Sequence, residues 1–204
     1  KADRVFVSPC GANANIFQDF DLSRDKSTFT FVGRLVPKKN PLGLIRAVKI
    51  VERSYPEIKL NIVGDGELLP QCLNLVSELQ LEKKVSFWGR LSRSEINKLL
   101  NTSSAYIQFS RAADDGDSEG LPVSILEAGL TCTPVVSTYH GGITEVITDA
   151  QYGLLSGEDD EHALADNMRL IISDPEHARL MGQKLHTKIT NRYTLQHLIE
   201  EKIE

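Results

Sequence analysis

Thr28-Phe-Thr-Phe-Val32 is rich in β-branched and aromatic residues and ends at Gly33 and Arg34. A short run of this kind, bounded by glycine, is typical of a buried β-strand. Residues 41–54, which follow a short loop, carry apolar side chains at helical spacing. The chain therefore passes from a strand through a glycine-containing loop to a helix, the repeating unit of an α/β fold.

The same alternation continues on the C-terminal side of this unit. Further strands are predicted at residues 59–63, 84–88, 105–109, 134–137 and 153–155, with helices at 67–80, 92–101, 122–130 and 143–147. Strands separated by helices indicate a parallel sheet that is covered on both faces. Residues 160–173, 175–191 and 194–203 then read as helices with no strand between them. We predict an α/β, Rossmann-like three-layer fold with a helical C-terminal tail.

The composition excludes several classes of function. The chain has 204 residues, is 41% hydrophobic and 25% charged, and has a net charge of −5, which leaves no basic surface for nucleic acid. Its cysteines, Cys10, Cys72 and Cys132, are too few and too widely spaced for a disulfide framework or a zinc site. No apolar run approaches the roughly 20 residues of a membrane span. We expect a cytoplasmic protein that, in its full-length form, is at most peripheral to the inner membrane.

The sequence Glu119-Gly-Leu-Pro-Val-Ser-Ile-Leu-Glu127 combines a glycine turn, a helix start and two carboxylates. Pro122 suits the first helical position, which would make Leu121 the N-cap. Leucine has no side-chain oxygen for the first helical amides, so this helix start can accept an external anion. Gly120 allows close approach of the backbone to a ligand. Together these features favour a ligand with both phosphate and hydroxyl groups, such as a nucleotide sugar.

The pattern resembles the E-x7-E signature of retaining glycosyltransferases of the GT-B-fold family often called group 1 or family 4. The resemblance extends, in that family's order, to Gly33-Arg-Leu-Val-Pro-Lys-Lys39, Ile62-Val-Gly-Asp-Gly66, Val85-Ser-Phe-Trp-Gly89, Gly129-Leu-Thr-Cys-Thr-Pro-Val-Val136 and Gly141-Gly142. It implies that the chain is one half of a GT-B fold. Residues 1–25 would be the interdomain linker, and residues 26–204 the C-terminal domain that binds the nucleotide-sugar donor.

The resemblance also implies roles for individual residues. Arg34, Lys39 and Glu119 are predicted to be catalytic: the two cations would stabilise the departing diphosphate, while Glu119 would hold the sugar hydroxyls. Donor-binding roles fall on residues in or directly after these motifs: Gly33, Gly64, Asp65, Arg90, Leu91, Gly120, Leu121, Pro122, Val123, Ser124 and Glu127. Within this set, the Val123 and Ser124 amides would contact the diphosphate, and Glu127 the ribose. None of these residues would act as a nucleophile.

Other features of the sequence leave alternatives open. Asp115-Gly-Asp117 resembles a metal-binding D-x-D motif, but we interpret it as a polar loop, because Arg34 and Lys39 already neutralise phosphate. We expect no metal and no cofactor beyond the UDP- or GDP-linked donor. Trp88 fits a core position as well as a stacking platform. His140 is interpreted as an ordinary loop histidine.

The predicted activity is transfer of a sugar, with retention of configuration, to a glycan or lipid-linked acceptor in bacterial polysaccharide synthesis. The acidic loop before Glu119, residues 110–118, resembles that of bacterial exopolysaccharide enzymes of the colanic-acid type. The predicted partners are the nucleotide sugar, the acceptor and the N-terminal domain of the same enzyme, with no nucleic acid. We expect this chain alone to be an inactive fragment. Two alternatives are another GT-B enzyme, such as a nucleotide-sugar epimerase, and a non-catalytic nucleotide-sugar-binding module.

Overall fold

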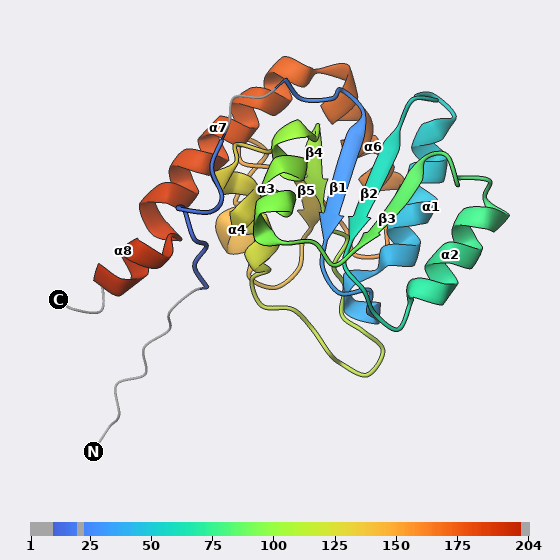
Figure 1. Ribbon diagram of the computed structural model, residues 1–204, viewed down its shortest axis with the longest axis horizontal. Helices are drawn as coiled ribbons and strands as arrows, with labels where there is room; N and C mark the ends of the chain where they lie inside the picture. The colour runs from blue at the N-terminus through green and yellow to red at the C-terminus, as the bar shows by residue number, and fades with distance from the viewer. Residues whose placement is uncertain (1–9, 20–22, 201–204) are drawn as a thin grey trace.

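The computed structural model describes residues 10–19 and 23–200 of the chain. Its centre is a six-stranded, entirely parallel sheet (Figure 1). The strands are β1 (Thr28–Val32), β2 (Lys59–Val63), β3 (Val85–Gly89), β4 (Ala105–Ile107), β5 (Val135–Thr138) and β6 (Leu154–Ser156). Their order across the sheet is β3-β2-β1-β4-β5-β6. Such an order requires crossover connections, which the helices between the strands supply.

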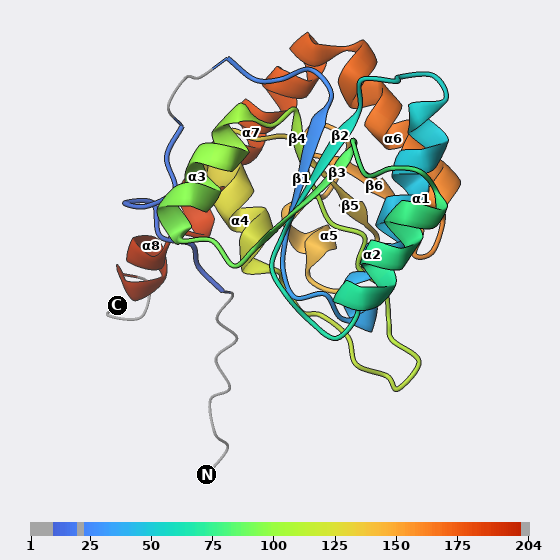
Figure 2. The ribbon, with the colours of Figure 1, turned by 45° about the vertical axis from the view of Figure 1, so that its right-hand side comes forward.

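Helices cover both faces of the sheet (Figures 1 and 2). On one face α1 (Pro41–Glu52) packs against α2 (Leu69–Glu78) and α6 (Glu161–Ser173). On the other, α4 (Val123–Leu130) packs against α3 (Arg93–Thr102) and α7 (Pro175–Arg192). The shorter elements are the 3-10 helix η1 (Pro37–Lys39), α5 (Ile143–Val146) and α8 (Leu195–Glu200). None of the described helices is both long and apolar enough to cross a membrane.

The burial of the central strand explains its composition. Phe29 and Phe31 are fully buried in the core beneath α1 and α6. Thr30, between them in sequence, points to the opposite face and is also fully buried, where its hydroxyl lies 2.7 Å from Ser103 Oγ. A strand covered on both faces cannot show a simple alternation of polar and apolar residues.

The order in which strands are added to the sheet reverses where β1 and β4 lie side by side. From β1 the sheet grows outward through β2 and β3, and on the other side through β4, β5 and β6. Ligands of open parallel sheets bind outside the carboxyl ends of the strands at this kind of switch point. The long loop that follows β4 projects from this edge of the molecule (Figure 1).

The structure confirms the predicted fold class, and β1 and β2 have the predicted bounds. The other elements differ from prediction mainly at their ends, where assignments commonly shift by one or two residues. The segment predicted as an interdomain linker lies partly outside the described residues. Of its described part, Phe17 is buried in the core and Ala12 forms a bridge to Thr194. Its role as a linker stays a prediction.

Candidate functional site

A cavity of about 690 Å³ opens at the carboxyl ends of β1, β2 and β3. The side chain of Arg34 is exposed and forms no hydrogen bond or ion pair with any described residue. A Cβ on Gly64, which has φ +132°, would lie only 1.9 Å from Gly33 O, so the two loops approach closely only because glycine is present. The lining consists of Val32, Gly33, Arg34, Val36, Val63, Gly64, Asp65, Gly66, Glu67, Arg90, Leu91 and Ile96. The structure thus brings together six of the predicted site residues.

Lys39 and Glu119 form an ion pair next to this cavity. Lys39 Nζ lies 2.6 Å from Glu119 Oε2, and the two side chains are only 10% and 11% exposed. A Cβ on Gly33 would lie 3.4 Å from Lys39 Cε, which places the lysine side chain beside the cavity wall. Burial lowers the pKa of Lys39, and the attraction of Glu119 only partly offsets it. The pair therefore combines a poorly hydrated cation with a carboxylate.

Glu119 Oε2 accepts further hydrogen bonds from residues of the loop after β4. Gln108 Nε2 donates to this oxygen at 2.7 Å and Ser110 Oγ at 3.1 Å. Oε1, in contrast, accepts no hydrogen bond from the described residues. One carboxylate oxygen thus fixes the side chain, and the other remains available to a ligand.

A second branch of the network connects the sheet to the start of α4. Tyr106 Oη lies 2.7 Å from Ser124 Oγ, and the Ser124 hydroxyl donates to Gln108 Oε1 at 3.2 Å. Tyr106 is fully buried and its pKa is raised by that burial, so it stays protonated. The side chain of Ser124 is therefore bound to the sheet, and its backbone amide is left for a ligand.

The start of α4 corrects one prediction. Pro122, not Leu121, is the N-cap: its backbone is extended (φ −66°, ψ 122°), its carbonyl accepts from Ile125 N at 3.1 Å, and the helix begins at Val123. Leu121 instead packs against the second hydrophobic core, which favours the one-residue shift. The expected lack of a side-chain cap is confirmed. The Val123 and Ser124 amides precede the first hydrogen bond of the helix and can accept an anion.

Glu127 lies on α4 with its side chain only partly exposed. Burial raises its pKa, against a smaller opposing effect of Arg93. A carboxylate on a largely apolar helix is costly for the folded state unless a ligand bonds to it. Glu127 is therefore a candidate for a hydroxyl-binding residue.

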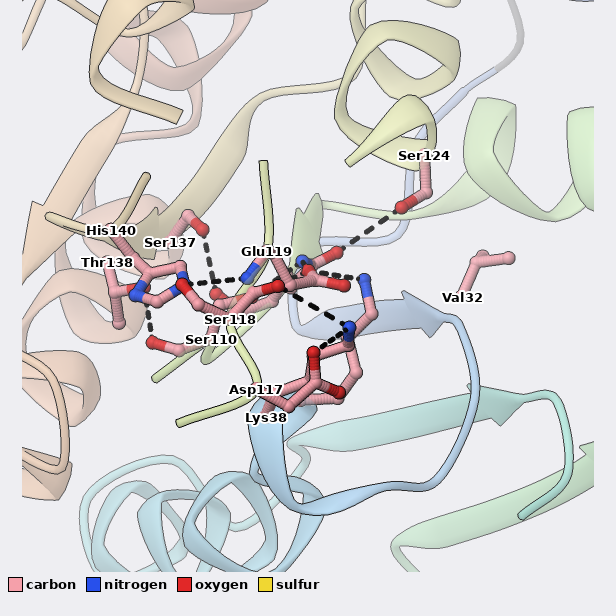
Figure 3. A network of polar contacts seen from close by, with 12 residues as sticks. Val32, Lys38, Ser110, Asp117, Ser118, Glu119, Ser124, Ser137, Thr138 and His140 are labelled. Carbon is pink, nitrogen blue, oxygen red and sulfur yellow. Dashed lines mark hydrogen bonds and ion pairs between the residues drawn. The ribbon is translucent and has the colours of Figure 1, made fainter. Parts of the chain in front are cut away.

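The acidic loop is held by salt bridges and hydrogen bonds. Asp117 pairs with Lys38 at 2.9 Å (Figure 3), and the Arg111 guanidinium lies 3.5 Å from Asp114 and 3.6 Å from Asp159. Lys38, for which we predicted no role, thus anchors this loop beside Glu119. Nowhere in the described part of the chain do three His, Cys, Asp or Glu residues cluster as metal ligands would.

Two residues differ from their expected environments. Trp88 is 50% exposed and donates from its ring nitrogen to Asn61 at 3.0 Å, so it belongs neither to the core nor to the lining of the 690 Å³ cavity. His140, interpreted as an ordinary loop histidine, is 95% buried and bonded through both ring nitrogens. Its position just before Gly141-Gly142, after a buried strand, was the only signal in the sequence.

These features define a Rossmann-like domain with a candidate ligand site at the carboxyl edge of its sheet. Residues 13–187 match the family described as glycosyl transferases group 1. That match covers most of the chain, so the protein belongs to this glycosyltransferase family. The resemblance to group 1 glycosyltransferases read from the sequence is thereby confirmed.

Relatives of this chain include several named bacterial glycosyltransferases. The chain is 35% identical over 134 residues to the amylovoran biosynthesis glycosyltransferase AmsK of Erwinia amylovora, covering 66% of this chain and 33% of AmsK. It is 32% identical over 137 residues to the putative colanic acid biosynthesis glycosyltransferase WcaL of Escherichia coli, covering 67% of this chain and 34% of WcaL. A Campylobacter jejuni N-acetylgalactosaminyltransferase named for a PP-undecaprenol-linked substrate is 30% identical, covering 85% and 46%. The chain thus spans about a third to a half of these relatives.

Solved glycosyltransferase structures share the fold. Staphylococcus aureus TarM, in a complex that contains UDP, superposes with a TM-score of 0.85 at 20% identity, covering 99% of this chain and 39% of TarM. The C-terminal domain of the group 1 family protein LpcC from Francisella tularensis gives 0.80 at 21% identity, covering 91% of this chain and 100% of that domain. Anabaena HepE, in complex with UDP-glucose, gives a TM-score of 0.81 at 20% identity, covering 94% of this chain and 54% of HepE. At these identities the likeness concerns the fold alone.

Proposed function

We propose that this chain is the C-terminal, donor-binding domain of a retaining glycosyltransferase that uses a UDP- or GDP-linked sugar. The observation that carries the proposal is the direct contact of Lys39 with Glu119 beside the cavity that Arg34 lines. In a nucleotide sugar the anomeric carbon is joined to the diphosphate through one oxygen. A cation for the diphosphate and a carboxylate for the sugar hydroxyls must then lie side by side, as these two residues do.

The donor would extend along the sheet edge. The cavity wall formed by Gly33, Gly64 and Asp65, with Arg90 and Leu91, would hold the nucleoside, and Glu127 its ribose. Arg34, Lys39 and the amides of Val123 and Ser124 would bind the diphosphate. Glu119 and the backbone of Gly120, Leu121 and Pro122 would bind the sugar. Catalysis would then consist of positioning and of stabilising the charge on the leaving diphosphate.

Several observations support a role in bacterial glycan synthesis. The printed names of AmsK and WcaL refer to amylovoran and colanic acid biosynthesis, and the Campylobacter enzyme is named for an undecaprenol-linked glycan. The match of this chain to a solved domain over that domain's whole length supports the assignment to a C-terminal domain. The acceptor of the proposed enzyme is accordingly a glycan or a lipid-linked glycan.

The experiment is a calorimetric titration of the chain with UDP, UDP-glucose, UDP-galactose, GDP and GDP-mannose, each with and without EDTA. We expect saturable binding of one nucleotide and its sugar, unchanged by EDTA, because Arg34 and Lys39 supply the positive charge. In Glu119→Ala the bare nucleotide should bind as before and the nucleotide sugar more weakly. Failure of all five probes would reject the proposed function, and a loss with EDTA restored by Mg²⁺ would assign Asp115 and Asp117 to a metal.

A further inference from the structure

His140 contacts the backbone of Glu119 from the loop between β5 and α5. Its side chain is 4% exposed. The main-chain N–H of Glu119 donates to His140 Nε2 at 3.1 Å, and Ser118 Oγ lies at the same distance from Nε2 (Figure 3). On the other side of the ring, Nδ1 lies 2.6 Å from Glu158 Oε1. Both ring nitrogens are therefore bonded to residues at the sheet edge.

These partners specify one tautomer of the imidazole. A backbone N–H can only donate, so Nε2 must carry a lone pair toward Glu119. The ring proton then resides on Nδ1 and is donated to the carboxylate of Glu158. Burial alone would raise the pKa of Glu158, but hydrogen bonds from His140 and from the Ala112 amide lower it overall, so Glu158 remains an ionised acceptor. Glu158 thus keeps Nε2 available as an acceptor.

The residues after His140 approach Glu119 from its carbonyl side. Gly141 has φ +46°, and a Cβ there would lie 2.2 Å from Glu119 O. The Gly142 amide donates to Gly120 O at 3.1 Å. The loop of His140, Gly141 and Gly142 therefore fixes the backbone of Glu119 on both sides, while Lys39 and Gln108 fix its carboxylate.

We propose that His140 is a positioning residue that aligns Glu119 with the donor sugar, and that Glu158 holds His140 in the tautomer this requires. The inference rests on the proposed function, in which Glu119 binds the sugar. In this proposal His140 acts through Glu119 and not by contact with the ligand. Loss of the acceptor nitrogen of His140 would release the Glu119 backbone and misalign its carboxylate. The affinity for the nucleotide sugar would then fall, while the affinity for the bare nucleotide would not.

The test compares His140→Leu, which removes the acceptor, with His140→Gln, whose side-chain oxygen can replace Nε2. Each is titrated with bare UDP or GDP and with the one of UDP-glucose, UDP-galactose and GDP-mannose that binds the unmodified chain. We expect His140→Leu to weaken binding of the nucleotide sugar roughly five- to thirtyfold and that of the bare nucleotide less than about twofold. His140→Gln should recover much of the loss. Glu158→Ala, which frees the tautomer, should weaken only the nucleotide sugar.

The outcomes separate this inference from the proposed function. If the unmodified chain binds none of the probes, the proposed function fails first. If it binds them and Glu119→Ala weakens only the nucleotide sugar, but His140→Leu and Glu158→Ala do not, the positioning role is wrong. Equal losses for bare nucleotide and nucleotide sugar would likewise reduce His140 to a structural residue. If His140→Leu does not fold, the affinities of Glu158→Ala and His140→Gln for the nucleotide sugar are compared instead. The positioning role then requires a loss in Glu158→Ala that His140→Gln largely avoids.

Discussion

Lys39 and Arg34 are both cations at the candidate site, yet their surroundings differ. Lys39 is buried in an ion pair with Glu119, whereas Arg34 is exposed and unpaired among the described residues. A ligand phosphate would therefore meet Arg34 directly, and would have to share Lys39 with Glu119. We therefore expect the two residues to contribute similarly to diphosphate binding but differently to the stability of the fold.

We expect Arg34→Ala and Lys39→Ala each to weaken binding of the nucleoside diphosphate by ~1.5–3 kcal/mol, the range of charge-assisted hydrogen bonds. Lys39→Ala should also lower the free energy of unfolding by about 1–3 kcal/mol, because it leaves Glu119 buried without its cation. Arg34→Ala should leave stability nearly unchanged. Calorimetry and urea denaturation measure the two effects.

Lys38→Ala is the matched control, since Lys38 neighbours Lys39 but pairs with the exposed Asp117. Its effect on nucleotide affinity should be small. Unchanged affinity in both Arg34→Ala and Lys39→Ala would remove these residues from the diphosphate site.

When no ligand is bound, Glu127 should lower the stability of the folded chain at neutral pH. Its raised pKa means that the folded protein holds a proton on Glu127 more tightly than the unfolded chain does. The ionised side chain therefore destabilises the fold at neutral pH. This penalty is absent below about pH 4.5, the ordinary value, and grows as the pH rises through the folded-state pKa.

Glu127→Gln should accordingly raise the free energy of unfolding at pH 7, while the gain over the unmodified chain disappears below pH 4.5. The same variant should weaken bare UDP or GDP by ~1.5–3 kcal/mol if Glu127 binds the ribose. Thermal unfolding at a series of pH values, with nucleotide titrations, tests both parts. A variant that is less stable at pH 7 and binds normally would contradict this view of Glu127.

At the scale of the elements, Asn40 connects three segments of the chain. It adopts a left-handed backbone (φ 44°), and its side chain caps α1 by accepting from Gly43 N at 3.0 Å. Its amide also donates to Asp159 at 2.9 Å, in the loop before α6. Asparagine tolerates the left-handed region better than most residues, which suits it to this position.

We expect Asn40→Ala to lower the free energy of unfolding by about 1.5–3 kcal/mol, because alanine loses the cap and is strained at positive φ. Asn40→Gly should cost less than about 1 kcal/mol, since glycine adopts this φ freely and is tolerated as an N-cap. Urea denaturation of the two variants measures the difference. Equal losses would show that the link to Asp159, rather than backbone strain, is what matters.

The elements also show how far the sequence could predict the site. Local composition predicted the strands and the loops at their ends, because strand and turn preferences act over a few residues. The pairing of Lys39 with Glu119 spans 80 positions, and that of His140 with Glu119 spans 21, and both are set by the packing of loops from different strands. The helix start at Val123 was missed by one residue because burial of Leu121 competes with the preference of proline for the first helical turn.

At the scale of the whole molecule, the site occupies one open edge of a single sheet. The cavity is lined by residues from the ends of β1, β2 and β3 and from α3, all within this domain. The described residues form one parallel sheet, and the curated relatives are two to three times as long as the region matched here. A second domain in the proposed enzyme would supply the opposite wall of the cleft and hold the acceptor.

This arrangement predicts that the 204-residue chain binds its donor but does not transfer the sugar. Arg34, Lys39, Glu119 and Glu127 lie within one domain with its own core, so binding should survive in isolation, though weakly. Transfer also requires an acceptor aligned with the anomeric carbon, and nothing among the described elements faces the site from the other side. Incubation of the purified chain with the donor that it binds and with undecaprenol-linked acceptors measures transfer, and calorimetry on the same sample verifies that the donor is bound. Multiple-turnover transfer by this chain alone would show that the acceptor site lies within it, and that the two-domain interpretation is wrong.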